Sequence, residues 1–468
     1  MPRLDLKYSY YVFGLILLSM IPFFKTFSAI ICVYLIYKGS IDQKFMAYSW
    51  VNFLMVLNAA LIGYPSSIDT FLRIFITILG FFIIFIEHRK KIKKQNSVFL
   101  MNTIVCSIFL TITIINNNIQ YPSLSFFKLF LFYIGSSFSI LLFDLIKNYK
   151  NIFSWMFALF INVLIFSFII YFFFHELGTF KENLFMGSLV HPNKVGMFLL
   201  PYLAFYFGMI STNQKGSNLL KAFTIGAVII LFLLSGSRGS FFSLLLSLTM
   251  TMFVIIFSKK YRNYIKHILK DSFKIILLLI ATIFLITYGS SLKLFWEDFL
   301  LKNNSVSDFN LTNLFLQSRG WKIFISYNVF LDNKLLGIGF GAPTPEEYGI
   351  PFEIISSGIS QEVRITYDPI FGLPIAAPVE KGFFFTGLLE EVGLVGTISY
   401  AFFYFIWCKR IILKSNSIYN VLIFFIILSI NIFEFQWFSM GSGAFYWLWL
   451  GFVTKNANNQ INHKRIKI

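Results

Sequence analysis

Four short segments of the sequence combine charged side chains with glycine or proline, a pattern that can bind or transfer a charged group. The first is His191-Pro192-Asn193-Lys194-Val195-Gly196, which opens a long apolar stretch. Its Pro and Asn are typical of a helix start, so plain capping is one interpretation. In the functional interpretation, His191 and Lys194 lie at a membrane surface beside an anionic head group.

The second segment is Ser235-Gly236-Ser237-Arg238-Gly239-Ser240, a very short turn between two apolar stretches. Its two glycines permit a tight turn or close packing. A cation such as Arg238 is costly at the edge of hydrocarbon unless it is paired or lines a wet cavity, although snorkelling to the interface would also relieve that cost. Because guanidinium groups bind phosphate in a bidentate manner, we favour a diphosphate contact for Arg238.

The third segment is Gln317-Ser318-Arg319-Gly320-Trp321, followed by Leu336-Gly337-Ile338-Gly339-Phe340-Gly341. A glycine-rich run binds a nucleotide when a strand precedes it and a helix follows it, and we expect neither of these flanking elements in this loop. The glycines are expected to shape the chain after an amphipathic helix at 314–331. Arg319 is a second candidate phosphate ligand, and an ordinary surface arginine is the alternative.

The fourth segment is Pro378-Val379-Glu380-Lys381-Gly382, which leads into an apolar stretch that contains Glu390 and Glu391. In a helix that starts near residue 383 and rises about 1.5 Å per residue, both acids lie roughly 10–13 Å into the membrane. Acidic side chains at that depth mark functional sites. A shallow re-entrant or tilted start would instead leave them at the interface.

The elements that must position these segments are membrane helices. Of the 468 residues, 57% are hydrophobic and only 13% are charged, which excludes an ordinary soluble domain. Backbone groups in lipid must be paired within their own segment, and no alternating pattern of a transmembrane barrel is present. We therefore predict an all-α integral membrane protein with roughly 12–14 spans. The predicted spans are 9–23, 26–38, 45–63, 68–86, 98–115, 126–146, 152–174, 193–210, 219–234, 239–257, 272–288, 383–407, 418–433 and 436–453.

The basic residues give the predicted orientation. The net charge of +18 is concentrated in the connections at 87–97, 147–151, 211–221, 258–271 and 408–417. Such clusters are typical of cytoplasmic loops, so both termini are predicted to be cytoplasmic and a nucleic-acid partner is not expected. The three cysteines, Cys32, Cys106 and Cys408, read as small apolar residues rather than a disulfide or metal framework.

One connection differs from all the others. Residues 289–381 hold many acidic side chains and half of the chain's prolines. The alternation of the predicted spans places them on the extracytoplasmic side. A connection of this length is unusual unless it is functional. The predicted organisation is a helix bundle at 1–288, a large extracytoplasmic loop at 289–381 with an irregular part at 342–380, and C-terminal helices with a cytoplasmic tail at 382–468.

From His191 to Gly396 the chain resembles the O-antigen polymerase and O-antigen ligase family of bacterial envelope proteins. The resemblance rests on the order of Ser235–Gly239, Arg319, Gly337–Gly341 and Glu391-Val392-Gly393-Leu394-Val395-Gly396, together with one large outer loop late in the chain. It implies a fold related to membrane-embedded glycosyltransferases and a bacterial plasma-membrane location. It also implies a polyprenyl-diphosphate glycan donor bound by Arg238 and Arg319, and transfer without a metal or cofactor.

The resemblance has one departure. Ligase-type members carry a histidine about ten residues before the acid that Glu391 matches, and this region has Glu380-Lys381-Gly382-Phe383 instead. Polymerisation of lipid-linked oligosaccharide is therefore favoured over ligation. The expected general base is Glu380, then Glu391, then His191. Lys381 would hold substrate charge or act on Glu380, and Lys194 is a further anion contact.

Three alternatives stay open at this stage. A ligase would transfer the glycan to another acceptor, whereas a flippase or transporter would move it without forming a bond. A non-catalytic envelope scaffold would not need clustered arginines and membrane acids. The expected partners are donor and acceptor glycans, the bilayer, and other membrane proteins of polysaccharide assembly.

Overall fold

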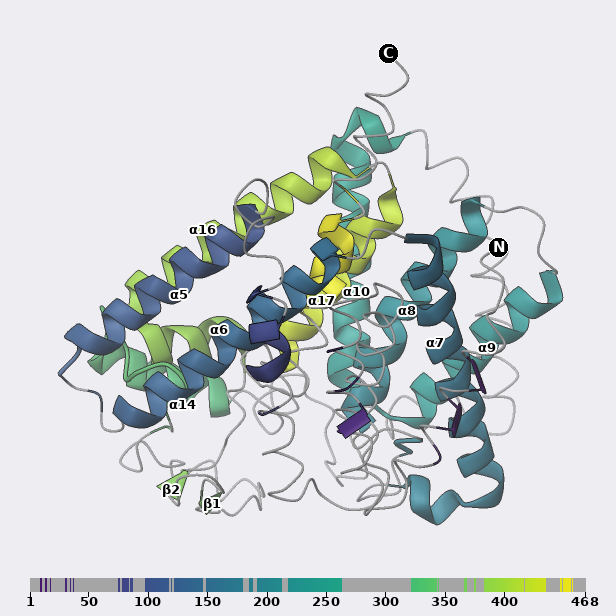
Figure 1. Cartoon of the computed structure of the whole chain (residues 1–468), viewed down its shortest axis with the longest axis horizontal. Helices are drawn as coiled ribbons and strands as arrows, with labels where there is room; N and C mark the ends of the chain where they lie inside the picture. Colours follow the sequence, from purple (N-terminus) through teal and green to yellow (C-terminus); the bar gives the residue numbers. More distant parts are fainter. Residues whose placement is uncertain are drawn as a thin grey trace, which may run out of the picture.

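The computed structural model is predominantly helical (Figure 1). It describes residues 97–117, 119, 122–145, 149–179, 185–187, 192–212, 218–262, 321–342, 344, 366–367, 374–375, 383–415, 417–434, 447, 449–455 and 457. Before residue 97 it describes residues 9–10, 13–14, 17, 30–31, 34, 37, 75, 78–83 and 85–86, which are helical. The predicted spans 45–63 and 272–288 lie outside the described residues.

The helix bounds follow the apolar runs of the sequence. The long helices are α5 (Ser97–Ile115), α6 (Pro122–Leu145), α7 (Tyr149–Phe173), α8 (Pro192–Thr212), α9 (Asn218–Leu234), α10 (Arg238–Phe257), α16 (Phe384–Lys414) and α17 (Ile418–Glu434). Shorter elements are the 3₁₀ helix η1 (His175–Gly178) and the helix α14 (Trp321–Asp332). Each long helix coincides with a predicted span to within a few residues, except that α16 extends seven residues past the predicted end at 407.

Three described helices are long and apolar enough to cross a membrane, namely Val98–Ile115, Gly239–Phe257 and Phe384–Lys414. The structure therefore has the composition of a helical membrane protein in the part that it describes. The predicted total of spans and the side on which 289–381 lies stay predictions.

Helix α10 shows how these helices present lipid-compatible surfaces. Its buried face is a stripe of small polar side chains, Ser240, Ser243, Ser247 and Thr251, whereas its exposed side chains include Leu245, Met252, Phe253 and Ile256. The stripe lies against neighbouring helices, and α10 packs most extensively on α17. Small residues inside with large apolar residues outside are typical of helices that associate in lipid.

The helices form two neighbouring groups in Figure 1, with α5, α6, α14 and α16 on the left and α7, α8 and α9 on the right. Helices α5 and α16 lie side by side in opposite directions, and the rings of Phe109 and Tyr400 meet at 6.2 Å between centroids. Helix α17 connects the groups, because it packs on both α8 and α16, and α10 packs on α17 and α8.

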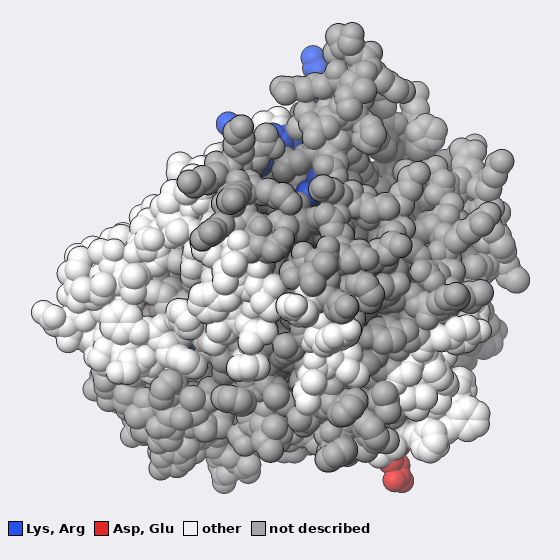
Figure 2. Space-filling view, in the orientation of Figure 1, with Lys and Arg blue, Asp and Glu red and all other residues white. Residues whose placement is uncertain are grey.

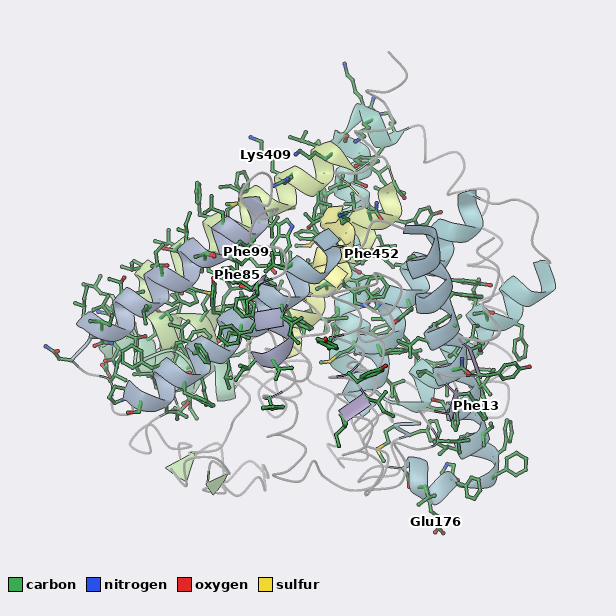
Figure 3. The ribbon with its side chains drawn as sticks, viewed as in Figure 1. Phe13, Phe85, Phe99, Glu176, Lys409 and Phe452 are labelled. Atoms are coloured by element: carbon green, nitrogen blue, oxygen red, sulfur yellow. The ribbon has the colours of Figure 1, made fainter. Side chains whose placement is uncertain are left out.

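The charges visible in Figure 2 separate toward opposite ends of the molecule. Lys and Arg gather at the upper end, where Figure 3 labels Lys409 of α16, and Glu176 of η1 lies at the lower end. At the upper end, the Lys260 ammonium donates to the carbonyl oxygens of Leu413 and Ser415. Two connections that were predicted to share the cytoplasmic side, 258–271 and 408–417, are therefore in direct contact.

The predicted loop 289–381 contains described helix and described strand. Helix α14 covers the second half of the helix predicted at 314–331. Strands β1 (Thr366–Tyr367) and β2 (Pro374–Ile375) pair antiparallel within 342–380, so this part is not wholly irregular as predicted. Thr, Tyr and Ile have strand propensity, which explains the pairing locally.

Candidate functional site

Helix α16 is interrupted at Gly393, beside the two acidic residues. Gly393 has φ 62° and ψ −165°, values outside the helical region. The rings of Phe384 and Tyr400 lie 5.6 Å apart between centroids, whereas a straight helix would separate the two residues by roughly 24 Å along its axis. The segment before Gly393 therefore folds back on the segment after it. The premise of a straight helix from residue 383, on which the 10–13 Å depth of Glu390 and Glu391 was predicted, is wrong.

The glycine-rich loop after α14 fills the interruption with backbone hydrogen bonds. The N–H groups of Ile338 and Gly339 donate to the carbonyl oxygens of Glu390 and Glu391, each at 2.9 Å. On the other side of the break, the N–H of Leu394 donates to Lys334 O at 2.9 Å, and the N–H of Val395 donates to Leu335 O at 3.3 Å. An interrupted helix leaves orphan carbonyls and orphan N–H groups, and the loop supplies partners for both.

The loop after α14 and the break in α16 together form what we call the junction, and the carboxylates of Glu390 and Glu391 are part of it. Both side chains are buried. The Thr344 hydroxyl donates to Glu390 Oε1 at 2.6 Å, and the Gly341 N–H donates to Glu391 Oε2 at 2.8 Å. Acids at the end of a helical segment meet the negative end of its dipole, so these donors offset an unfavourable position. The two acids hold the loop in place through their side chains as well as through their backbone.

Helices α5 and α6 complete the junction from the opposite side. The Asn116 amide at the end of α5 donates to Gly337 O at 2.6 Å, and the Lys128 ammonium on α6 donates to Gly341 O at 2.6 Å. The peptide groups of Gly341 are thus held between a cation on the carbonyl and a carboxylate on the N–H. An ammonium on a carbonyl oxygen is a charge-assisted hydrogen bond, which is stronger than a neutral one.

An aromatic contact anchors the same loop. Phe340, which is almost fully buried, lies 5.5 Å from Phe109 and 5.4 Å from Phe132 between ring centroids. Its side chain therefore inserts between α5 and α6 while the glycines on either side approach the helices closely. A Cβ atom on Gly337 would lie 2.6 Å from Glu390 O, so only glycine permits this approach.

The segments around Lys194 and Arg238 form a second corner of the site. Both residues lie in the first turn of a helix, Lys194 in α8 and Arg238 as the first residue of α10. A Cβ atom on Gly196 would overlap the Ser240 side chain, so the two helix starts are in contact. Backbone N–H groups at helix starts favour anions, and the starts of α8 and α10 are adjacent.

A chain of aromatic rings connects this corner to the start of α16. The ring of Phe433, near the end of α17, lies 6.2 Å from Phe242 in the first turns of α10 and 6.5 Å from Phe383. Phe383 directly precedes α16 and follows Glu380 and Lys381 closely in the sequence. Described parts of the first three segments singled out from the sequence, and Phe383 directly after the fourth, therefore lie at one end of the helices, opposite the contact between Lys260 and α16.

The structure places some predicted site residues and not others. Glu391 lies in the junction, and the backbones of Lys194 and Arg238 lie at adjacent helix starts. The predictions for His191, Arg319, Glu380 and Lys381 fall outside the described residues. Sequence reasoning missed Lys128 and Asn116, although a lysine in an apolar stretch whose other charged residue, Asp144, lies at the far end could have indicated the former.

Comparison with known proteins adds no assignment, because no protein-family model and no curated protein matches this chain. Within the described residues no group of three or more His, Cys, Asp or Glu side chains could hold a metal ion. The fold and the site define a helical protein of membrane composition with an interrupted helix, buried acids and adjacent basic helix starts.

Proposed function

We propose that this protein polymerises polyprenyl-diphosphate-linked oligosaccharide repeat units at the outer face of a bacterial plasma membrane. The observation that carries the proposal is that described parts of the first three segments, and Phe383 directly after the fourth, lie at one end of the helices. That end is opposite the basic end, where Lys260 contacts the carbonyl groups at the end of α16. By the positive-inside rule the basic end is cytoplasmic, so the convergent end faces outward.

The proposed reaction is a glycosyl transfer between two lipid-linked glycans. A hydroxyl oxygen of the acceptor sugar attacks the anomeric carbon of the donor, and a new C–O bond forms. The bond between that carbon and the diphosphate oxygen breaks, and the electron pair leaves with the polyprenyl diphosphate. The hydroxyl proton passes to a general base, for which the carboxylate of Glu380 is the first candidate and the imidazole of His191 the alternative.

The basic helix starts suit the leaving group in this reaction. Negative charge develops on the diphosphate as the bond breaks, and fixed cations stabilise that charge without a metal. Arg238 and Lys194 occupy adjacent helix starts, whose N–H groups add a favourable field. Arg319 and Lys381 are assigned to the same anion in the proposal.

The hydrogen bonds of Glu391 suggest a positioning role rather than the role of base. Its carboxylate accepts the Gly341 N–H, and the side chain is almost fully buried. A base must reach the acceptor hydroxyl, whereas Glu391 reaches the loop that follows α14. We therefore assign Glu391 to holding that loop, and keep Glu380 as the base.

The test is polymerisation by purified protein in detergent with a synthetic polyprenyl-diphosphate oligosaccharide repeat, read as a ladder on a gel. Arg238→Ala should abolish the ladder at normal protein levels. The matched control is Arg262→Ala, because Arg262 is an exposed arginine just beyond the end of α10 that is opposite Arg238. A full ladder from both Arg238→Ala and Arg319→Ala would overturn the proposal. Transfer only to a different added acceptor would instead indicate a ligase.

One observation favours a second candidate, a flippase or transporter of lipid-linked glycan. Interrupted helices with backbone groups at the break are common in secondary transporters, and α16 has such a break at Gly393. The two candidates differ in bond formation. Movement of fluorescent donor lipid between the leaflets of proteoliposomes, with no new glycosidic bond in the same sample, would identify a transporter.

A further inference from the structure

Helix α14 has an exposed apolar face that the proposed chemistry does not use. Phe324, Tyr327 and Leu331 are 50%, 46% and 39% exposed, and Leu335 in the following turn is 65% exposed. Their spacing of three, four and four residues places them on one side of the helix. The opposite side is buried at Ile325, where α14 packs on α16. The helix is thus apolar on the inside and on the outside.

This exposed face is continuous with the outward surface of the membrane-spanning part of α16. Leu335 O accepts the N–H of Val395, and Lys334 O accepts the N–H of Leu394. The side chains of Leu394 and Val395 are exposed, as is that of Ile398 one turn further along α16. One apolar surface therefore runs from Phe324 through the turn and onto a helix that is long enough to cross a membrane.

The depth of this surface follows from the helices around it. Beyond the break, α16 is uncharged from Leu394 to Cys408 and continues past Lys409 and Arg410 to Lys414, roughly 31 Å in all at about 1.5 Å per residue. This length reaches across the hydrocarbon of a bilayer with the basic residues near one edge. Asn116, at the end of the apolar helix α5, contacts Gly337. The turn after α14 therefore lies at the level where both crossing helices end.

We infer that α14 lies in the outer boundary of the bilayer, with Phe324, Tyr327, Leu331 and Leu335 against lipid acyl chains. The 12 described residues of the helix span about 18 Å, which is less than the hydrocarbon thickness and suits an interfacial position. The exposed Asp332 and Lys334 then meet the head groups, and Tyr327 belongs to an aromatic belt. Part of the segment predicted to be an extracytoplasmic loop is thereby a membrane element.

The inference does not depend on the proposed function, because it concerns which solvent covers α14. It has a consequence for any chemistry at the junction. The glycine-rich loop and the buried acids would lie where acyl chains give way to head groups. A lipid-linked substrate presents its first phosphate at that level, whereas a water-soluble substrate does not.

The test uses nitroxide labels on single cysteines in proteoliposomes, after Cys32, Cys106 and Cys408 are replaced by alanine. The test positions are Phe324→Cys and Leu331→Cys. Ile398→Cys on α16 is the lipid reference, and Glu176→Cys on η1 is the water reference. For each label, the accessibility to oxygen is divided by the accessibility to a water-soluble nickel chelate.

Ratios at Phe324→Cys and Leu331→Cys that approach the ratio at Ile398→Cys are the expected result. Ratios equal to that of Glu176→Cys would overturn the inference, because α14 would then face water. Low accessibility to both reagents would also overturn it, because another protein segment or a second copy would then cover the face. If the cysteine-free chain does not fold, a photoactivatable phospholipid should label residues 323–335 of the unaltered protein, and absence of label there counts against the inference.

Discussion

A single methyl group at Gly393 would test whether the interruption of α16 holds the junction together. The φ of 62° and ψ of −165° fall in a region that is accessible to glycine and hardly to other residues. A Cβ atom on Gly393 would also overlap the backbone carbonyl of Leu335. Gly393→Ala must therefore both strain the break and push the loop away from it.

The magnitude follows from these two costs. A non-glycine residue in this backbone region costs about 1–3 kcal/mol. Moving the loop away breaks the hydrogen bonds from Leu394 and Val395 to the loop carbonyls, at about 0.5–1.5 kcal/mol each. The two costs together lead us to expect that Gly393→Ala lowers the free energy of unfolding by about 2–6 kcal/mol.

The assay is equilibrium unfolding in mixed micelles with increasing sodium dodecyl sulfate, together with hydrogen exchange of the amides at 338–339 and 394–395. The control is Gly226→Ala in α9, where nothing lies within 4 Å of the added Cβ atom. Alanine in place of this helical glycine should leave stability unchanged or raise it by up to about 1 kcal/mol. Equal midpoints for the two variants, with unchanged amide exchange, would refute the reasoning.

Two further substitutions test the contacts at the two ends of the helices. Lys128→Met removes the charge-assisted hydrogen bond to Gly341 O and roughly keeps the length of the side chain. We expect the free energy of unfolding to fall by about 1.5–3 kcal/mol in the same assay, and the Gly341 amide to exchange faster. Unchanged exchange at Gly341 would contradict the assignment. Tyr261→Phe removes the hydroxyl whose one proton is shared between Ile412 O at 2.8 Å and Ser415 O at 2.6 Å. The expected loss is about 1–2 kcal/mol with no change in amide exchange at the junction, and a change there would show that the two ends are coupled.

The sequence was sufficient to predict most of the helices. The predicted spans 98–115 and 239–257 coincide with two helices that are long enough to cross a membrane, Val98–Ile115 and Gly239–Phe257. Both are unbroken apolar runs, so the cost of an unpaired backbone in lipid determines their structure locally. The end of α16 was placed too early because Lys409 and Arg410 interrupt the apolar run. The helix continues to Lys414 since its carbonyl groups there accept hydrogen bonds from Lys260 and Tyr261.

The interruption of α16 was beyond prediction from local sequence. A glycine in an apolar helix is usually a packing position, and nothing around Gly393 distinguishes it from Gly396, which has no positive φ. What distinguishes Gly393 is the loop at 334–341, more than fifty residues away, whose backbone pairs with both sides of the break. Backbone hydrogen bonds carry no side-chain signature, so the pairing leaves only the three glycines of the loop as an indirect sign.

The same reasoning explains why the four segments could be picked out but not assembled. Each contains a residue type that is costly in lipid or a glycine that permits close approach, and these are local properties. The described parts of the first three segments, and Phe383 after the fourth, are brought to one end by contacts between distant elements, such as Gly196 on Ser240 and Phe433 between Phe242 and Phe383. Lys128 shows the limit most clearly. Its position at the start of α6 is compatible with snorkelling to an interface, and only its bond to Gly341 makes it part of the junction that also holds Glu391. A charge near a helix end thus becomes a site residue through the loop that reaches it, which is why we expect Lys128→Met to affect the junction.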